Sequence, residues 1–264
     1  MVGFIGCGNM ASAIINGILS SGFLDNASIG VYDILTEKAE TFAKEKGIRC
    51  FANERELIEG CSTVVFAVKP NDLLSILGRL RYDLSKSDPL IISIAAGKST
   101  SEISALLPYA PRTVRIMPNI NAKVCAAISA YCGNERVTDE DREFIKGFCG
   151  AFGKGIEIEE KLFSIYSAIG GCSPAFVYMF IDSLARGAVK NGMTKSAALE
   201  VAAQAVLGSA KMILESDEHP WSLVDAVCSP GGTTIEGVAS LQKDGFESSI
   251  INAVEASYNK DKTM

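Results

Sequence analysis

The first residues of the chain form a short apolar run that leads directly into a glycine-rich turn. The run covers residues 2–5, the turn is Gly6-Cys7-Gly8-Asn9-Met10-Ala11, and a helical pattern follows over residues 12–20. This order of strand, G-x-G-x-x-A turn and helix is the context that a dinucleotide-binding fingerprint requires. Gly6 permits the tight turn, and Gly8 lets a pyrophosphate approach the backbone and the helix N-terminus. We therefore expect a dinucleotide-binding βαβ unit at the start of the chain.

The rest of the first half alternates between apolar strands and helical segments. Strands are expected over residues 28–32, near Ile48, and over 63–68, 89–95 and 113–117, with a helix over 36–46. This alternation predicts an α/β, doubly wound and mostly parallel sheet, that is, a Rossmann domain. We expect it to occupy residues 1–158. A Rossmann-like domain that binds no nucleotide is the alternative.

Two strand ends in this domain are candidate cofactor contacts. Ala67-Val68-Lys69-Pro70 spans the end of one predicted strand, and Ala95-Ala96-Gly97 follows another. Ligands of open α/β sheets bind outside the carboxyl ends of the strands. Both segments are therefore expected where the nicotinamide half of a cofactor would rest. Without this position, Lys69 would be interpreted as a solvated surface lysine.

Asp33 stands at the end of the second predicted strand. An acid at this place usually binds the ribose 2′-OH and disfavours a 2′-phosphate, so Asp33 favours NADH over NADPH. The following residues 34–38 contain no arginine that could hold a phosphate, although Lys38 could assist. The alternative for Asp33 is a cap on the next helix.

The second half of the chain has a helical pattern from about Glu159 onward. Helices are expected over residues 162–170, 174–191, 195–216, 221–227 and 234–244. The helix that contains residues 176–181 is apolar nearly all round and must be buried on most sides. A helical domain of about 100 residues has difficulty enclosing such a helix alone. We therefore expect an all-α domain over residues 159–264 that forms a homo-oligomer, most simply an interleaved dimer. A compact monomeric domain is the alternative.

A second glycine turn, Ser229-Pro230-Gly231-Gly232-Thr233-Thr234, precedes the last of these helices. Adjacent glycines allow close approach and positive φ, so the turn can direct several backbone N–H groups at one anion. One glycine turn could hold a cofactor and the other a substrate.

Composition excludes several classes of protein. The net charge of −6 gives no basis for nucleic-acid binding, and we expect no apolar stretch long enough to span a membrane. The N-terminus lacks the positive region of a signal peptide. Eight cysteines without C-x-x-C spacing and a single histidine, His219, predict no metal site. Reduced thiols in the cytoplasm fit this pattern. His219 is expected to have a local structural role.

The chain resembles the pyrroline-5-carboxylate reductase family over its full length. The segments that carry the resemblance are Gly6–Ala11, Ala67–Pro70, Ala95–Gly97, Arg115-Ile116-Met117-Pro118-Asn119, Gly171-Cys172-Ser173-Pro174-Ala175, and Asp225-Ala226-Val227-Cys228 followed by the second glycine turn. The last segment resembles the family signature and is the most specific of them.

The resemblance implies a Rossmann domain and an all-α domain that forms an intertwined dimer, with decamers in some members. It implies reduction of L-1-pyrroline-5-carboxylate to L-proline, the last step of proline biosynthesis, by hydride from NADPH or NADH. The residues implied for the cofactor, besides Asp33, are Gly6 to Ala11, Asn53, Ala67 to Pro70 and Ala95 to Gly97. Those implied for the substrate are Glu160, Glu218, Ser229, Gly231, Gly232, Thr233 and Thr234. Thr234 would act in catalysis by bonding the ring nitrogen.

Two other classes of function stay open from the sequence. One is a different two-domain reductase, for imines or β-hydroxyacids, although no lysine beside the second glycine turn matches the one that hydroxyacid dehydrogenases use. The other is a non-catalytic sensor of NAD(P)H. The second glycine turn favours an enzyme, because a sensor needs no second anion site.

Overall fold

The structure is a computed structural model of the chain and describes residues 1–107 and 109–263. It divides into two compact units, Met1–Gly171 with the residues from Asp261 onward, and Cys172–Lys260. The domain boundary predicted after residue 158 stays a prediction, and Met264, at the end of the predicted second domain, lies outside the described residues. Each unit is described by itself below.

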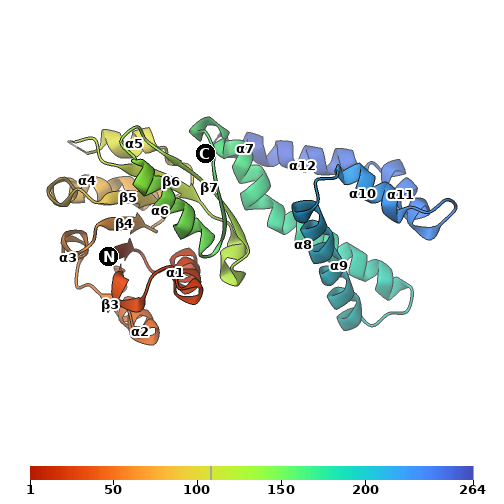
Figure 1. Ribbon diagram of the computed structural model, residues 1–264, viewed down its shortest axis with the longest axis horizontal. Coiled ribbons are helices and arrows are strands. Elements are labelled where there is room, and N and C mark those ends of the chain that lie inside the picture. The colour runs from red at the N-terminus through yellow and green to blue at the C-terminus, as the bar shows by residue number, and fades with distance from the viewer. Residues whose placement is uncertain (108, 264) are drawn as a thin grey trace. The chain divides into compact units, whose positions relative to one another are not determined.

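The first unit is built on an eight-stranded sheet with the order β3-β2-β1-β4-β5-β6-β7-β8 within the described residues (Figure 1). The strands are β1 Val2–Ile5, β2 Ile29–Tyr32, β3 Arg49–Cys50, β4 Thr63–Phe66, β5 Leu90–Ser93, β6 Thr113–Met117, β7 Ala127–Gly133 and β8 Gly153–Glu157. Neighbouring strands are parallel except for β6 and β7. From β1 the chain first builds the sheet toward β3 and then returns to add β4 on the other side. The switch point of the sheet therefore lies between β1 and β4.

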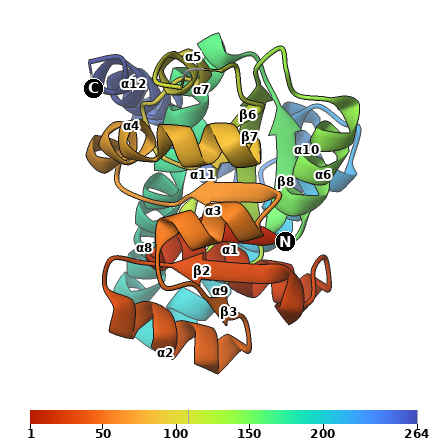
Figure 2. The same cartoon turned by 90° about the vertical axis from the view of Figure 1, so that its left-hand side faces the viewer.

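Helices cover both faces of this sheet (Figure 2). They are α1 Asn9–Ser21, α2 Thr36–Lys46, α3 Glu54–Gly60, α4 Pro70–Ser87, α5 Thr100–Ala105 and α6 Asp139–Gly150. Successive residues of a strand point to opposite faces, and β1 follows this rule. Phe4 belongs to the core beneath α1 and α6, whereas Ile5 belongs to the core beneath α3 and α4. The predicted doubly wound, mostly parallel Rossmann fold is confirmed.

Strands β7 and β8 were not predicted from the sequence. In β8 two of five residues, Gly153 and Gly155, are glycines, and the strand lies at the edge of the sheet. Gly155 is required there because a Cβ would stand 2.7 Å from that of Cys149. An edge strand rich in glycine lacks the β-branched run that identifies a buried strand.

The helix predicted over residues 162–170 is irregular. A 3₁₀ turn, η3 Glu160–Leu162, leads into α7 Phe163–Tyr166 and then a π-helical turn, Ser167–Cys172. The Nδ2 atom of Asn119 donates a hydrogen bond of 2.9 Å to the carbonyl of Gly170 in this turn. A Cβ at Gly170 would stand 2.6 Å from the ring of Tyr166. Tertiary contacts of this kind explain why the segment departs from the regular helix that its apolar pattern predicts.

The second unit is helical, as predicted. Its helices are α8 Ser173–Lys190, α9 Lys195–Glu215, α10 Pro220–Val227, α11 Thr233–Lys243 and α12 Phe246–Asp261, the last of which was not predicted. The buried core that the described residues form here is small and consists of Ala185, Ala198 and Ala202. Large apolar side chains are exposed instead, among them Met179 at 71% and Leu214 at 78%. A unit with so little core needs a partner surface.

Two helical stretches meet the length and composition of a membrane span, Glu160–Lys190 and Lys195–Glu215. The expectation that no apolar stretch would be long enough is therefore wrong for these two. Charged residues stand mostly near their ends, and the small residues of α9 raise its mean hydropathy without giving it bulk. Within the chain only 28% and 11% of the two windows are buried.

The eight cysteines are free thiols, and Cys7, Cys61, Cys132 and Cys149 are buried. Burial raises the pKa of the Cys132 and Cys149 thiols to about 12. These side chains therefore stay protonated near neutral pH and act as small apolar groups in the core.

Candidate functional site

The first glycine turn connects β1 to α1 at the switch point of the sheet. Gly6 has a φ of +103°, which L side chains rarely adopt. A Cβ here would stand 2.6 Å from the carbonyl oxygen of Ala67, and the Gly6 N–H donates to the carbonyl of Tyr32 at 2.7 Å. The turn is thus packed against the backbone at the ends of β2 and β4, and only glycine fits.

Gly8 serves a different purpose in the same turn. It is the N-cap of α1 in an extended conformation and has no side chain with which to cap the helix. Apart from its neighbours in the chain, no heavy atom of the described residues would stand within 4 Å of a Cβ at Gly8. The first backbone N–H groups of a helix have no intrahelical partner, and the positive end of the helix dipole adds to them. This combination fits the pyrophosphate of a dinucleotide.

The Cys7 thiol between these glycines is buried, and burial raises its pKa. It therefore remains a neutral thiol at neutral pH. A thiolate beside a pyrophosphate would repel it, so the protonated state suits an anion site.

Asp33 holds the end of β2 against the glycine turn. Its Oδ2 accepts a hydrogen bond of 2.7 Å from the Cys7 N–H, and its Oδ1 accepts one of 3.0 Å from the Leu35 N–H. The N-cap of α2 is Leu35, so Asp33 does not take the capping role that was the alternative. An ionised carboxylate offers about four acceptor positions, so Asp33 retains capacity for ribose hydroxyls.

A cavity of about 320 Å³ opens beside Asp33. Its lining includes Asp33, Glu54, Asp72 and Arg79. Arg79 donates to both oxygens of Glu54, at 2.8 and 3.3 Å, so its charge is already compensated. Asp33 and Asp72 leave the cavity with a net negative charge.

Asn53 lies at the start of α3, where it acts as the N-cap. Its Oδ1 accepts from the Glu56 N–H at 2.9 Å, and its Nδ2 donates to the Glu56 carboxylate at 3.0 Å. The side chain is thus engaged within its own helix. Its predicted contact with the cofactor stays a prediction.

The other predicted cofactor segments follow β4, which pairs with β1 in the sheet, and β5, which pairs with β4. The N–H of Ala67 donates to the carbonyl of Ile5 at 2.8 Å, and Lys69 and Pro70 begin α4 as its N-cap and first residue. Ala95 is buried, and its N–H donates to the Ser93 hydroxyl at 3.3 Å. The structure therefore brings the ends of β1, β4 and β5 together at one edge of the sheet.

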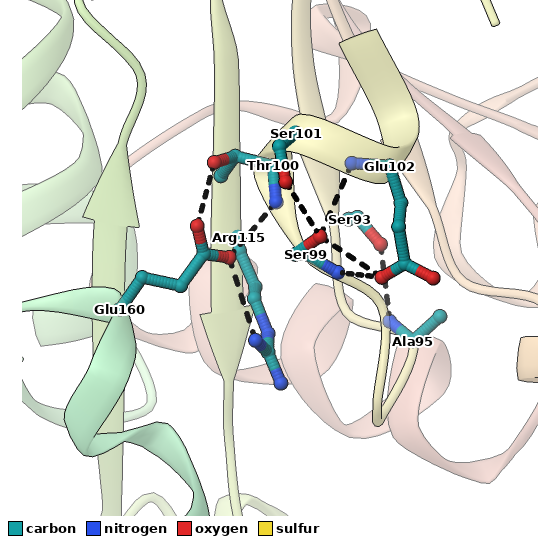
Figure 3. A network of polar contacts seen from close by, with 8 residues as sticks. All are labelled: Ser93, Ala95, Ser99, Thr100, Ser101, Glu102, Arg115 and Glu160. Atoms are coloured by element: carbon teal, nitrogen blue, oxygen red, sulfur yellow. Dashed lines mark hydrogen bonds and ion pairs between the residues drawn. The ribbon is translucent and has the colours of Figure 1, made fainter. Parts of the chain in front are cut away.

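Glu160, predicted as a substrate contact, is bonded within the first unit (Figure 3). Its Oε1 accepts from the Thr100 N–H at 2.8 Å and from Nη1 of Arg115 at 3.4 Å. Its Oε2 accepts from the Thr100 hydroxyl at 2.7 Å. These partners lie 60 and 45 residues earlier in the chain, and no local pattern in the sequence points to them.

The second glycine turn is a β-turn that ends at the start of α11. The N–H of Gly232 donates to the carbonyl of Ser229 at 3.0 Å, Pro230 holds the second position, and Gly231 has a φ of +67°. This is the geometry of a type II turn. Gly232 is the N-cap of α11 in an extended conformation, and like Gly8 it has no side chain with which to cap the helix.

Thr233 and Thr234 are the first two residues of α11, and both are exposed. Their hydroxyls have no hydrogen-bond partner among the described residues. Two hydroxyls and the bare N–H groups of the helix start therefore face solvent together. This set of donors suits a carboxylate.

Glu218 and His219 precede α10 in the same unit. His219 is the N-cap, and its Nδ1 accepts from the Trp221 N–H at 3.2 Å, as expected for a local structural role. The N–H of Glu218 donates to the Ser216 hydroxyl at 3.0 Å. This bond engages the backbone of Glu218 and not its carboxylate, and the residue is exposed.

Two family models match the chain. One, described as pyrroline-5-carboxylate reductase dimerisation, matches residues 160–264, and one described as NADP oxidoreductase coenzyme F420-dependent matches residues 1–97. The pyrroline-5-carboxylate reductase of Escherichia coli strain K12 is 38% identical over 263 residues, which cover 100% of this chain and 97% of that protein. The chain belongs to the pyrroline-5-carboxylate reductase family.

Other members of the family agree with this assignment. The reductase of Methanosarcina acetivorans is 36% identical over 100% of this chain and 97% of its own length. The solved structure of the Coxiella burnetii reductase has a TM-score of 0.93 and 31% identity, covering 99% of this chain and 97% of that one. The Plasmodium falciparum reductase, solved with NADP bound, has a TM-score of 0.87 and 32% identity over 99% of this chain and 97% of that one.

The chain is therefore an NAD(P)H-dependent oxidoreductase that reduces pyrroline-5-carboxylate to proline. The other two-domain reductases and the non-catalytic sensor are set aside. Self-association, predicted from the apolar helices, is confirmed, since the dimerisation model covers residues 160–264. The predicted site residues themselves stay predictions.

Sequence reasoning missed two features of the site. It did not find Thr100 and Arg115 as partners of Glu160, or the acidic cavity beside Asp33. The cavity had a partial signal, because Asp72 follows the end of the strand predicted over residues 63–68 by a few residues, and Glu54 follows the strand predicted near Ile48. Arg115 begins a segment that resembles the family, but its buried position could not be read from that segment.

Proposed function

We propose that the two glycine turns divide one reaction between them. The turn Gly6–Ala11 binds the cofactor, and the turn Ser229–Thr234 binds the carboxylate of pyrroline-5-carboxylate. The observation that carries the proposal is the shared form of the two sites. In each, a glycine at positive φ precedes a helix whose N-cap is a second glycine, so bare N–H groups are left for an anion. In this division residues 1–158 serve the cofactor, and residues 159–264 serve the substrate and self-association.

On the cofactor side each group has a distinct task. The N–H groups at the start of α1 bind the pyrophosphate, Asp33 binds the adenosine ribose, and Ala95 to Gly97 with Ala67 to Pro70 line the nicotinamide half. NAD(P)H supplies the hydride when it is bound. The protein's contribution is to hold the cofactor in one orientation and keep water from the reacting face.

On the substrate side the proposal assigns the carboxylate to the N–H groups and hydroxyls of Thr233 and Thr234, with Ser229 and the two glycines shaping the turn. The Thr234 hydroxyl bonds the ring nitrogen. The protonated imine accepts hydride at carbon, and the C=N π electrons become the lone pair of the product amine. Because pyrroline nitrogens are basic enough to be protonated near neutrality, the site needs orientation and electrostatics more than a strong base.

The direct test of this function is the oxidation of NADH or NADPH after pyrroline-5-carboxylate is added, followed by the absorbance of the reduced cofactor. The purified chain is expected to consume cofactor and form proline in equal amounts. Consumption of cofactor with no proline would contradict the proposal. Proline formation that does not require an intact Ser229–Thr234 turn would contradict it as well.

Glu218 is proposed to stabilise the protonated imine through water. Replacing it by glutamine keeps the shape and removes the charge, so kcat is expected to fall by about tenfold, or roughly 1.4 kcal/mol. The control is Asp217→Asn, which removes the neighbouring exposed charge. Unchanged kcat and KM in Glu218→Gln would refute the role.

Asp33 is proposed to make NADH the preferred cofactor. A 2′-phosphate would approach a cavity in which Asp33 and Asp72 are uncompensated, whereas a 2′-OH would donate to Asp33. Asp33→Thr is expected to shift the ratio of kcat/KM values toward NADPH by about tenfold. Asp72→Asn is the companion variant with a smaller shift. A wild-type enzyme that strongly prefers NADPH would contradict this proposal.

The assembly is proposed to contain an interleaved dimer as its smallest unit, with a decamer as the larger form. The chain is placed in the cytoplasm, with no nucleic-acid or membrane partner. The exposed apolar side chains of α8 and α9 support self-association, and the free thiols support the cytoplasmic location. Light scattering on the purified protein should give a mass of two chains or a multiple, and a monomer at micromolar concentration would contradict it.

A further inference from the structure

The protein occupies three of the roughly four acceptor positions of the Glu160 carboxylate. Three hydrogen bonds reach it, two from Thr100 and one from Arg115, at 2.8, 2.7 and 3.4 Å (Figure 3). A substrate group would have to compete with these donors. The geometry thus suits a residue that holds protein in place better than one that binds a ligand directly.

Thr100 is the first residue of α5, the helix that follows the segment Ala95–Gly97. The start of α5 is also fixed from inside by a capping box. The Ser99 N–H donates to Glu102 at 2.8 Å, and the Glu102 N–H donates to the Ser99 hydroxyl at 3.1 Å. These bonds lower the pKa of Glu102, which keeps its carboxylate ionised. Two carboxylates, one local and one distant, therefore fix this helix start.

The segment between β5 and α5 is anchored at both ends. At one end the N–H of Ala95 donates to the Ser93 hydroxyl. At the other, Glu160 holds Thr100. Between them, Ala96 and Gly97 are exposed, and Gly97 has a φ of +70° with more than 4 Å of space around its Cβ position in the described residues. A short exposed segment of this kind keeps its conformation mainly through its anchors.

Arg115 orients Glu160 from the sheet. It lies on β6, is only 9% exposed, and its guanidinium stacks on the ring of Phe163 at 4.3 Å from the centroid. Phe163 begins α7, just after Glu160 in the chain. A buried guanidinium requires a carboxylate partner, so Arg115 adds one longer contact, at 3.4 Å, to the two short bonds that join Glu160 to Thr100.

We infer that Glu160 is a positioning residue for the cofactor, which acts through Thr100 on the segment Ala95–Gly97, and not a direct ligand of the substrate. The inference rests on the proposed function for one point only, that this segment lines the nicotinamide half of the cofactor. It also assigns Arg115 and Phe163 to the same task. Their role is to keep the carboxylate of Glu160 in the orientation that Thr100 requires.

The test measures cofactor and substrate separately in Glu160→Ala and Glu160→Gln. Binding of NADH without substrate is followed by its fluorescence, and KM for pyrroline-5-carboxylate is measured at saturating NADH. Glu160→Ala is expected to weaken NADH binding by about tenfold and to change the substrate KM by less than about twofold. Glu160→Gln keeps an oxygen for the Thr100 N–H, so it should recover part of the affinity.

Two further variants make the result specific. Thr100→Val removes the hydroxyl that donates to Glu160, so it should also weaken NADH binding. Glu159→Ala removes a neighbouring exposed carboxylate, which among the described residues forms an ion pair with Lys161, and it should change neither constant. Amide exchange of residues 95–100 should rise in Glu160→Ala and stay unchanged in Glu159→Ala. If Glu160→Ala fails to fold, the NADH binding and substrate KM of Thr100→Val decide between the two roles.

A raised KM for pyrroline-5-carboxylate with unchanged NADH binding would overturn the inference, because it would make Glu160 a substrate ligand. No change in either constant would overturn it as well. Failure of the proposed function gives a different pattern. In that case the wild-type chain does not oxidise NADH with pyrroline-5-carboxylate, whatever residue stands at position 160.

Discussion

Replacing Gly6 by alanine is expected to weaken cofactor binding by at least about 100-fold, or roughly 2.7 kcal/mol. It should also lower the free energy of unfolding by roughly 2 to 4 kcal/mol. Gly6 has a φ of +103°, and its Cβ would stand 2.6 Å from the backbone oxygen of Ala67. A backbone atom in a central strand connection cannot move aside as a side chain could. The glycine turn would therefore open and misplace the start of α1. Isothermal titration with NADH and thermal unfolding measure the two effects.

Two companion variants separate the fold from the binding site. Gly22→Ala places alanine at a φ of +70° at the end of the same helix, more than 4 Å from other described atoms, and should lower stability without changing NADH binding. Gly8→Val adds a side chain where the backbone is extended and space is free, so it should fold normally. It should still lose cofactor affinity by about 100-fold, because it occupies the approach of the pyrophosphate. Full affinity in Gly8→Val would contradict the assigned site.

The second large effect is expected at the other glycine turn. Gly231→Val should raise KM for pyrroline-5-carboxylate by about 100-fold while NADH binding stays unchanged. Gly231 has a φ of +67°, which a β-branched residue cannot adopt without strain. The type II turn would change conformation and carry the N–H groups of Thr233 and Thr234 out of alignment.

The matched control for this variant is Gly245→Val. Gly245 has a φ of +75°, and like Gly231 it has more than 4 Å of space around its Cβ position in the described residues. Both substitutions carry the same backbone penalty, of roughly 1 to 2 kcal/mol. Only Gly231→Val should change KM. An equal rise in both variants would mean that the effect comes from loss of stability and not from the loss of a substrate contact.

The fold could be predicted from the sequence where local signals agreed with tertiary structure. The strand and turn that end at Ala11, the apolar run of β4, and the helices α8 and α9 all carry strong periodic or compositional signals. Strand β8 carries no such signal in the sequence. Its glycines are required by close packing against α6 and β7 and not by any local preference.

The candidate site likewise contains residues that could be predicted from the sequence and residues that could not. The two glycine turns were found because backbone geometry imposes glycine at fixed spacings. The neighbours of Glu160 were not found, because Thr100 follows β5, Arg115 lies on β6 and Glu160 follows β8. Only the order of the strands in the sheet brings the three together. Asp33 was placed at the right strand end, but its bond to the Cys7 N–H could be seen only in the structure.

The prediction about membrane-spanning stretches was wrong. The expectation was that no apolar stretch is long enough for a membrane span, but the helices Glu160–Lys190 and Lys195–Glu215 each contain such a stretch. By length and composition the same helices could cross a bilayer. The dimerisation family model over residues 160–264 supports self-association of this part of the chain.

The most direct test of the division of labour between the two turns compares Gly8→Val and Gly231→Val in one set of measurements. For each variant the dissociation constant of NADH and the KM for pyrroline-5-carboxylate at saturating NADH are determined. We predict that Gly8→Val raises only the NADH constant and that Gly231→Val raises only the substrate KM. If Gly231→Val weakens NADH binding and leaves the substrate KM unchanged, the assignment of the substrate carboxylate to the Ser229–Thr234 turn is wrong.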